Sequence, residues 1–178
     1  YRSVAERIAD YLRRELQTPD GAFYSAQDAD SDGMEGKYYL FRYDELLSVL
    51  GEETGKKFND CYGITRKGNF GGYSIPNRLH ADKVGSDFDD ALPIIYEYRK
   101  NREKLHLDDK ILTSWNALMI AALALLYRVT GKDRYLSAAQ AAQRFIEENL
   151  SDGSRLFVSY RDGRQTGNGF LDDYAFYT

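Results

Sequence analysis

Two stretches of this sequence repeat the same order of features, and this repetition constrains the fold more than any other property of the chain. The stretches begin at Tyr1 and Tyr135, and each opens with apolar residues at helical spacing. Each then passes through an Asp-Gly pair, at residues 20–21 and 152–153, into a short aromatic strand. The shared continuation past the helix end favours a repeated supersecondary unit over chance similarity between two helices. Repeated helical hairpins predict a solenoid or a closed α/α toroid.

The remaining pattern is also mainly helical. Helices 113–129 and 134–150 are separated by a short connection, so they are expected to form an antiparallel pair. Aromatic runs at 22–24 and 37–41 flank a polar loop and predict a β-hairpin with a long acidic tip. Further helices are predicted at residues 1–16, 44–50, 52–62, 88–106 and from about 171, with a glycine-rich loop over 63–87. The predicted class is mainly α with short β-hairpins.

Composition limits the possible functions. The 178 residues are 43% hydrophobic and 29% charged, the balance of a globular protein with one core. A net charge of -4 argues against a nucleic-acid partner, because phosphate binding needs concentrated Lys and Arg. The longest apolar run, residues 117–127, is too short to span a membrane. The single cysteine, Cys61, excludes an intrachain disulfide and favours a reducing compartment, so a cytoplasmic location is expected.

Three acidic clusters are mixed with aromatic residues, as in a pocket that binds a sugar. The first contains Asp28, Asp30 and Asp32, the second Asp108 and Asp109, and the third Asp172 and Asp173. Glycoside chemistry needs one carboxyl group that donates a proton and a second that stays ionised. Two clusters stand at the starts of helices that would begin on one face of a toroid, and the acidic hairpin tip should overhang the same face, so we expect the three clusters to converge. The candidate catalytic residues are Asp109 and Asp173. The candidate substrate-binding residues are Asp28, Asp30, Asp108, Lys110, Trp115, Asn116, Asp172 and Tyr174.

Structural roles compete with each of these assignments. Asp172 and Asp173 stand where helix N-termini favour acidic caps. Residues 108–110 suit a local salt-bridged turn, and Trp115 suits a core position. The histidines, His80 and His106, have no partner at metal-ligand spacing.

A calcium loop is a further alternative for the first cluster. Asp28, Asp30, Asp32 and Gly33 match its front half, but Tyr39 stands where a bidentate Glu belongs. The better interpretation is an ordered acidic hairpin tip, so neither a metal nor a cofactor is expected.

Four motifs together resemble a known family. They are GAFYSAQDADSDGMEGKYYLF, GITRKGNF, DDKILTSWNALMIAALA and GFLDDYAF. Their order resembles the YyaL-like, spermatogenesis-associated group of thioredoxin-domain proteins. The resemblance implies a thioredoxin-like domain followed by an (α/α)6 toroid of the six-hairpin glycosidase type. Residues 1–178 would then be the N-terminal part of the single toroid domain, with the thioredoxin-like domain upstream and later hairpins downstream. A chain that starts without Met and stops inside an apparent helix fits such a segment.

These observations predict a carbohydrate-active or carbohydrate-binding protein with a small sugar as ligand. A glycoside hydrolase and a sugar epimerase both remain open, although the usual acid and base of an epimerase are histidines. The alternative is a non-enzymatic, redox-associated scaffold for the thioredoxin-like domain. The sequence does not indicate an oligomeric state.

Overall fold

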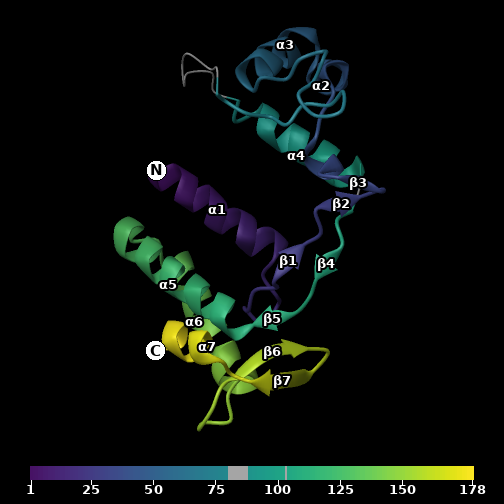
Figure 1. Ribbon diagram of the computed structural model, residues 1–178. Helices are drawn as coiled ribbons and strands as arrows, with labels where there is room; N and C mark the ends of the chain where they lie inside the picture. The colour runs from purple at the N-terminus through teal and green to yellow at the C-terminus, as the bar shows by residue number, and fades with distance from the viewer. Residues whose placement is uncertain (80–87, 103) are drawn as a thin grey trace. The chain divides into compact units, whose positions relative to one another are not determined.

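The computed structural model describes residues 1–79, 88–102 and 104–178 and is mainly helical, with short antiparallel strand pairs (Figure 1). It divides into two compact units. The repeat unit comprises Tyr1–Gln27 and Leu107–Thr178, and the inserted unit comprises Asp28–His106. The helix prediction is therefore confirmed at the level of the fold class.

The repeat unit holds helices that match the predicted ones closely. Their bounds are α1 (Arg2–Glu15), α5 (Thr113–Thr130), α6 (Asp133–Asn149) and α7 (Leu171–Tyr177). Helices α5 and α6 lie side by side, as their two-residue connection requires (Figure 1). Gly131 ends α5 in a left-handed conformation (φ 68°), which glycine adopts without steric cost.

The repetition in the sequence is also a repetition in the structure. After α1, the N–H of Tyr24 donates to the carbonyl of Leu16 at 2.9 Å. After α6, the N–H of Phe157 donates to the carbonyl of Leu150 at the same distance. Both Leu residues are the C-caps of their helices, so the two turns reverse the chain at the same point of the repeat, although the first turn is one residue longer. The predicted repeat of helix, turn and strand is confirmed.

Each turn leads into an antiparallel strand pair, but the two pairs are closed differently. In the second repeat, β6 (Phe157–Arg161) and β7 (Arg164–Asn168) are joined by Asp162 and Gly163. Both residues have positive φ, at 51° and 76°, the geometry of a tight type I′ turn. In the first repeat, β1 (Ala26–Gln27) pairs with β4 (Leu107–Asp108), and the whole inserted unit lies between them in the chain. The inserted unit therefore replaces a two-residue hairpin turn.

A third strand connects the repeats. Strand β5 (Ile111–Leu112) pairs with β6, with Ile111 opposite Tyr160 and Leu112 opposite Ser159. Two apolar clusters fill the unit, and α6 contributes to both of them. Gly21 shows how closely the first turn approaches α6, because a Cβ at Gly21 would lie 2.4 Å from the Cβ of Ala141. The positive φ of Gly21, 94°, also disfavours any larger residue.

The inserted unit has its own core, formed by Phe41, Leu46, Phe58, Ile64, Phe88, Ala91 and Ile95. Arg102 anchors one end of its last helix by donating to the carbonyls of Lys37, Tyr38 and Leu40 and to Glu45. The helices are α2 (Tyr43–Leu50), α3 (Glu52–Cys61) and α4 (Ala91–Arg102), with a 3-10 turn η1 (Lys37–Tyr39) and strands β2 (Asp30–Ser31) and β3 (Met34–Glu35). Helix α4 is shorter than predicted, and Pro93 lies in its first turn, where a missing N–H has no cost.

The predicted hairpin between residues 22–24 and 37–41 is wrong. Phe23 bridges to Gln17, and Phe41 bridges to Ser74, so the two aromatic runs have different partners. The acidic segment instead forms its own small hairpin, in which β2 pairs with β3. The predicted loop over 63–87 is confirmed for residues 63–79, while residues 80–87, including His80, lie outside the described part of the chain.

Candidate functional site

A polar hollow of about 270 Å³ lies within the repeat unit, and both repeats contribute to it. The contributing segments are the turn after α1, the loop between β4 and β5, the end of α6, and the turn between β6 and β7. Its lining residues are Thr18, Pro19, Asp20, Tyr24, Asp109, Ile111, Phe145, Asn149, Tyr160, Arg161 and Asp162. Asp109, one of the two candidate catalytic residues, is among them.

The carboxylate of Asp109 is only partly satisfied. Its Oδ1 lies 2.7 Å from Nε of Arg161, which makes a close ion pair. The N–H of Arg161 is nevertheless not directed at this oxygen, and Oδ1 is buried without a hydrogen-bond partner among the described residues. Because Oδ1 is buried, a ligand in the hollow meets Asp109 through the rest of its side chain, which is 40% exposed.

Further charge surrounds the same position. Asp20 and Asp162 are exposed carboxylates on the two turns that line the hollow. Arg161 lies 3.8 Å from the carboxylate of Asp162 as well as close to Asp109, so one guanidinium is shared by two acids.

Aromatic side chains form part of the wall. Phe145 and Tyr160 meet edge to face, with ring centroids 5.3 Å apart and an interplanar angle of 89°. Tyr24 is partly buried at the same hollow. Rings beside carboxylates provide the apolar faces and the acceptors that a sugar ring requires.

Asp173 has a different environment from Asp109. Its side chain is buried at 1% exposure, and its two oxygens accept hydrogen bonds from two helix starts. Oδ1 accepts from the N–H of Ser114 in the first turn of α5 at 2.9 Å. Oδ2 accepts from the N–H of Phe170, the N-cap of α7, at 2.8 Å. One carboxylate thus caps α7 and also binds the first turn of α5.

Asn116 and Tyr174 occupy equivalent places in the two repeats. Asn116 Oδ1 accepts from the N–H of Phe23 at 2.7 Å, and the Tyr174 hydroxyl accepts from the N–H of Leu156 at 3.0 Å. Phe23 and Leu156 are the residues that close the two turns. Asn116 also donates to the carbonyls of Phe23 and Leu112. The side chain of Asn116 therefore holds the first turn against α5, and that of Tyr174 holds the second turn against α7.

The other predicted residues of the repeat unit do not line the hollow. Asp108 makes an ion pair with Lys110, whose Nζ lies 3.1 Å from its Oδ2. Desolvation opposes ionisation of Asp108, but the side chain and backbone N–H of Lys110 lower its pKa overall. Trp115 is 54% exposed, against the core position suggested for it, and Asp172 is exposed beside the buried Asp173.

Asp28 and Asp30 belong to the inserted unit, and their predicted contact with ligand stays a prediction. Asp28 Oδ1 accepts from the N–H of Asp30 at 3.1 Å, as in an acidic turn. Asp32 makes an ion pair with Lys37, which lowers the pKa of Asp32 mainly through their hydrogen bond. Among the described residues, no group of three His, Cys, Asp or Glu side chains is placed to hold a metal ion.

Sequence reasoning missed most of the residues around Asp109. Asp20 was recognised only as part of a turn, and the sequence indicates only a turn at residues 161–163. The equivalent of Asp20 in the second repeat, Asp152, does not line the hollow, so the repeat carried no signal for this cluster.

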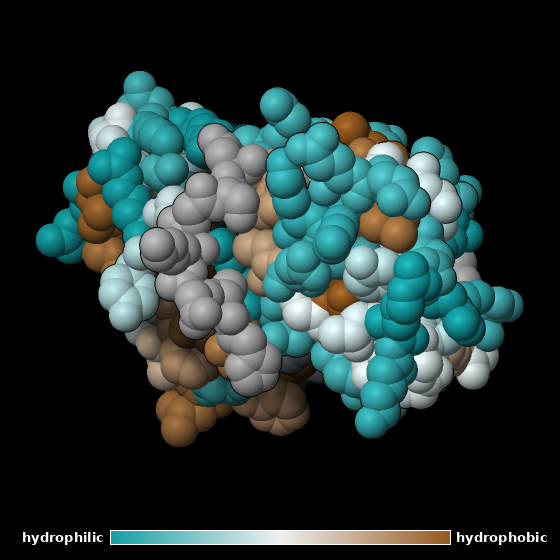
Figure 2. Space-filling view, turned by 90° about the horizontal axis from the view of Figure 1, so that it is seen from above, coloured by the Kyte–Doolittle hydropathy of each residue, from teal (hydrophilic) through white to brown (hydrophobic). Residues whose placement is uncertain are grey.

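The composition of the surface adds little information about the function of the protein. On the face shown in Figure 2, hydrophilic residues cover most of the surface and hydrophobic residues gather in a few patches. Within the part of the chain that the structure describes, no helix is long and apolar enough to cross a membrane.

The fold and the hollow together define a mainly helical protein built on helix, turn and strand repeats. Comparison with known proteins then identifies its relatives. The chain is 30% identical to human spermatogenesis-associated protein 20 over 99% of its length, and 28% identical to the mouse protein over the same share. It is 26% identical to an uncharacterized protein of Caenorhabditis elegans over 97% of its length. The chain belongs to the spermatogenesis-associated protein 20 family, as the motifs predict.

The chain spans 28% of the length of the human and mouse relatives and 30% of the nematode protein. No family model matches the sequence.

Proposed function

We propose that this chain contributes a carbohydrate-binding site, with Asp109 in the polar hollow as its functional carboxylate. The observation that carries the proposal is the polar hollow in which Asp109, 40% exposed and paired with Arg161, stands beside Asp20, Asp162 and two tyrosines. At about 270 Å³ the hollow is smaller than the pockets that bind drug-sized ligands, and this favours a single sugar unit. A carbohydrate-active role would use Asp109 together with Asp20 or Asp162, because glycoside chemistry requires a second carboxyl group.

The proposal extends to the fold. Two consecutive helical-hairpin repeats support the N-terminal part of an (α/α)6 toroid of the six-hairpin glycosidase type. In such a domain the inserted unit would be an insertion in the chain between β1 and β4 of the first hairpin. The catalytic role predicted for Asp173 is harder to support, because it would require Asp173 to give up two backbone hydrogen bonds.

The test is calorimetric titration of the full-length protein with a panel of monosaccharides and disaccharides. We expect binding that is lost in Asp109→Asn, because the amide removes the charge and half of the acceptor capacity of the carboxylate. Asp108→Asn is the matched control, since Asp108 pairs with Lys110 outside the hollow. Unchanged binding in Asp109→Asn, or no binding of any sugar by a folded protein, would contradict the proposal.

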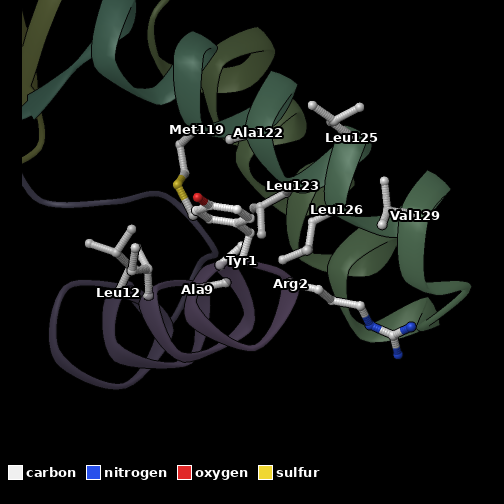
Figure 3. Close-up of a pocket in the computed structure, with 12 residues that line it drawn as sticks. Tyr1, Arg2, Ala9, Leu12, Met119, Ala122, Leu123, Leu125, Leu126 and Val129 are labelled. Atoms are coloured by element: carbon white, nitrogen blue, oxygen red, sulfur yellow. The ribbon is translucent and has the colours of Figure 1, made fainter. Parts of the chain in front are cut away.

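A second candidate is the interaction scaffold for a thioredoxin-like domain. An apolar groove of about 480 Å³ between α1 and α5 favours it (Figure 3). Ala9 and Leu12 of α1 face Met119, Leu123 and Leu126 of α5 across this groove. Val129→Asp, at a groove residue that is 59% exposed, should release a bound thioredoxin-like domain in a pull-down if the scaffold function is right, and should leave sugar binding unchanged.

A further inference from the structure

We propose that the ligand of the polar hollow carries a positive charge, so that an amino sugar with a free amine binds better than a neutral sugar. This inference rests on the proposed carbohydrate site and specifies its ligand class. Three carboxylates, from Asp20, Asp109 and Asp162, line the hollow. Arg161 is the only cationic side chain among its lining residues. The lining therefore carries an excess of negative charge.

Arg161 does not neutralise this charge. Its guanidinium is divided between Asp109 at 2.7 Å and Asp162 at 3.8 Å, and its side chain is 52% exposed. Solvent therefore screens part of its charge. Among the described residues, Asp20 makes no ion pair or hydrogen bond through its carboxylate. Asp20 lies on the turn where the chain reverses at Gly21, within the same hollow.

Hydrogen bonding is compatible with an ammonium group. The three carboxylates that line the hollow supply acceptors only. The amide nitrogen of Asn149 donates to the carbonyl of Phe145 at 3.2 Å, which leaves the amide oxygen to accept. An ammonium offers three donors and no acceptor, so it can bind several of these oxygens at once.

The aromatic wall is compatible with the same ligand. Tyr24 and Tyr160 both line the hollow, and Tyr160 packs edge to face on Phe145. Tyrosine rings attract a cation over their faces and also pack against the apolar face of a pyranose ring. An amino sugar presents both features, so it can use the rings and the carboxylates at once.

The experiment compares three ligands that share one ring, namely glucosamine, glucose and N-acetylglucosamine. Each is titrated calorimetrically into the full-length protein at about pH 6.5, below the pKa of about 7.7–8.0 typical of an α-amino group. We expect glucosamine to bind at least about tenfold more tightly than glucose at low salt, a difference of about 1.4 kcal/mol. N-acetylglucosamine should bind like glucose, because acetylation removes the charge. The preference should shrink as salt screens the carboxylates.

Variants separate this inference from the proposed function. Asp20→Asn should weaken glucosamine binding by a larger factor than glucose binding, and Asp152→Asn on the other Asp-Gly turn, outside the hollow, is the control for which both affinities should stay unchanged. Equal affinity for glucosamine and glucose would overturn the charge inference while the carbohydrate site stands. Tighter binding of glucuronate than of glucosamine would also overturn it. Failure of all sugars to bind would refute the proposed function itself.

Discussion

Asp173 offers the sharpest test of whether its carboxylate is structural or catalytic. The perturbation is Asp173→Ala, which removes the acceptor for the N–H groups of Ser114 and Phe170. Ser114 is buried, so its N–H would be left without a partner at a cost of about 1–3 kcal/mol. Phe170 is exposed, so water can replace its bond, and this loss adds about 0.5–1 kcal/mol.

The combined loss is therefore about 1.5–4 kcal/mol, which corresponds to a fall in Tm of about 3–16 °C for a chain of this size. Asp173→Asn keeps one amide oxygen and should lose about half as much. Trp115, the single tryptophan, is next to Ser114 in α5, so its fluorescence reports unfolding of the repeat unit directly. Urea titrations should show a lower midpoint with an unchanged slope.

Asp172→Ala is the matched control, because Asp172 lies in the same first turn of α7 but is exposed. It should change stability by no more than about 0.5–1 kcal/mol. If Asp173→Ala unfolded at the same urea concentration as Asp172→Ala, the capping argument would be refuted. If Asp173→Asn kept normal stability but lost sugar turnover, the catalytic prediction for Asp173 would gain direct support.

Three further predictions address the repeat and its turns. Gly21→Ala should destabilise the protein by about 2 kcal/mol or more in urea titrations, because the new Cβ would meet Ala141 and the positive φ adds strain; Gly153→Ala, with open space around it, should cost less. Asn116→Ala should cost about 2–4 kcal/mol by the same assay and Tyr174→Phe about 1 kcal/mol, since Asn116 holds both backbone groups of Phe23 and Tyr174 holds one N–H. Asp152 has a pKa held well below its usual value by Arg155 and then Ser154. Its contribution to stability is therefore complete above the unfolded pKa of about 3.9 and is lost as pH falls toward the folded value, so Asp152→Asn should flatten the acid limb of a Tm–pH curve.

The helices could be predicted because their apolar spacing is local information. The predicted helix 113–129 differs from the observed Thr113–Thr130 by one residue at its C-terminal end, and the predicted 134–150 differs from Asp133–Asn149 by one residue at each end. The two-residue strands carry no such period. Strand β1 pairs with β4 across the entire inserted unit, so its partner is set by tertiary structure and not by a local pattern.

The candidate site was predictable only in part for a related reason. Asp109 was predicted as a site residue because it belongs to an acidic pair near the start of a helix. The same pattern also predicted Asp173, whose two oxygens instead accept hydrogen bonds from two backbone N–H groups. An acidic residue before a helix is equally suited to capping and to ligand binding. The partner of Asp109, Arg161, lies in a turn whose sequence indicates only a hairpin.

Strand register brings Asp109 to the end of β6 that carries Arg161. Ile111 lies opposite Tyr160 in the β5–β6 pair, and both line the hollow. Asp109 precedes Ile111 by two residues, so an extended chain directs the side chains of Asp109 and Ile111 to the same face. Arg161 follows Tyr160 by one residue, so register alone does not place its side chain on this face, and the ion pair with Asp109 is a side-chain contact at the strand end. A slip of one residue would turn Ile111 away from Tyr160. The hollow is thus a product of the contact between the two repeats, and neither repeat contains all of its carboxylates. Loss of the β5–β6 register should therefore abolish ligand binding before it unfolds α5 or α6.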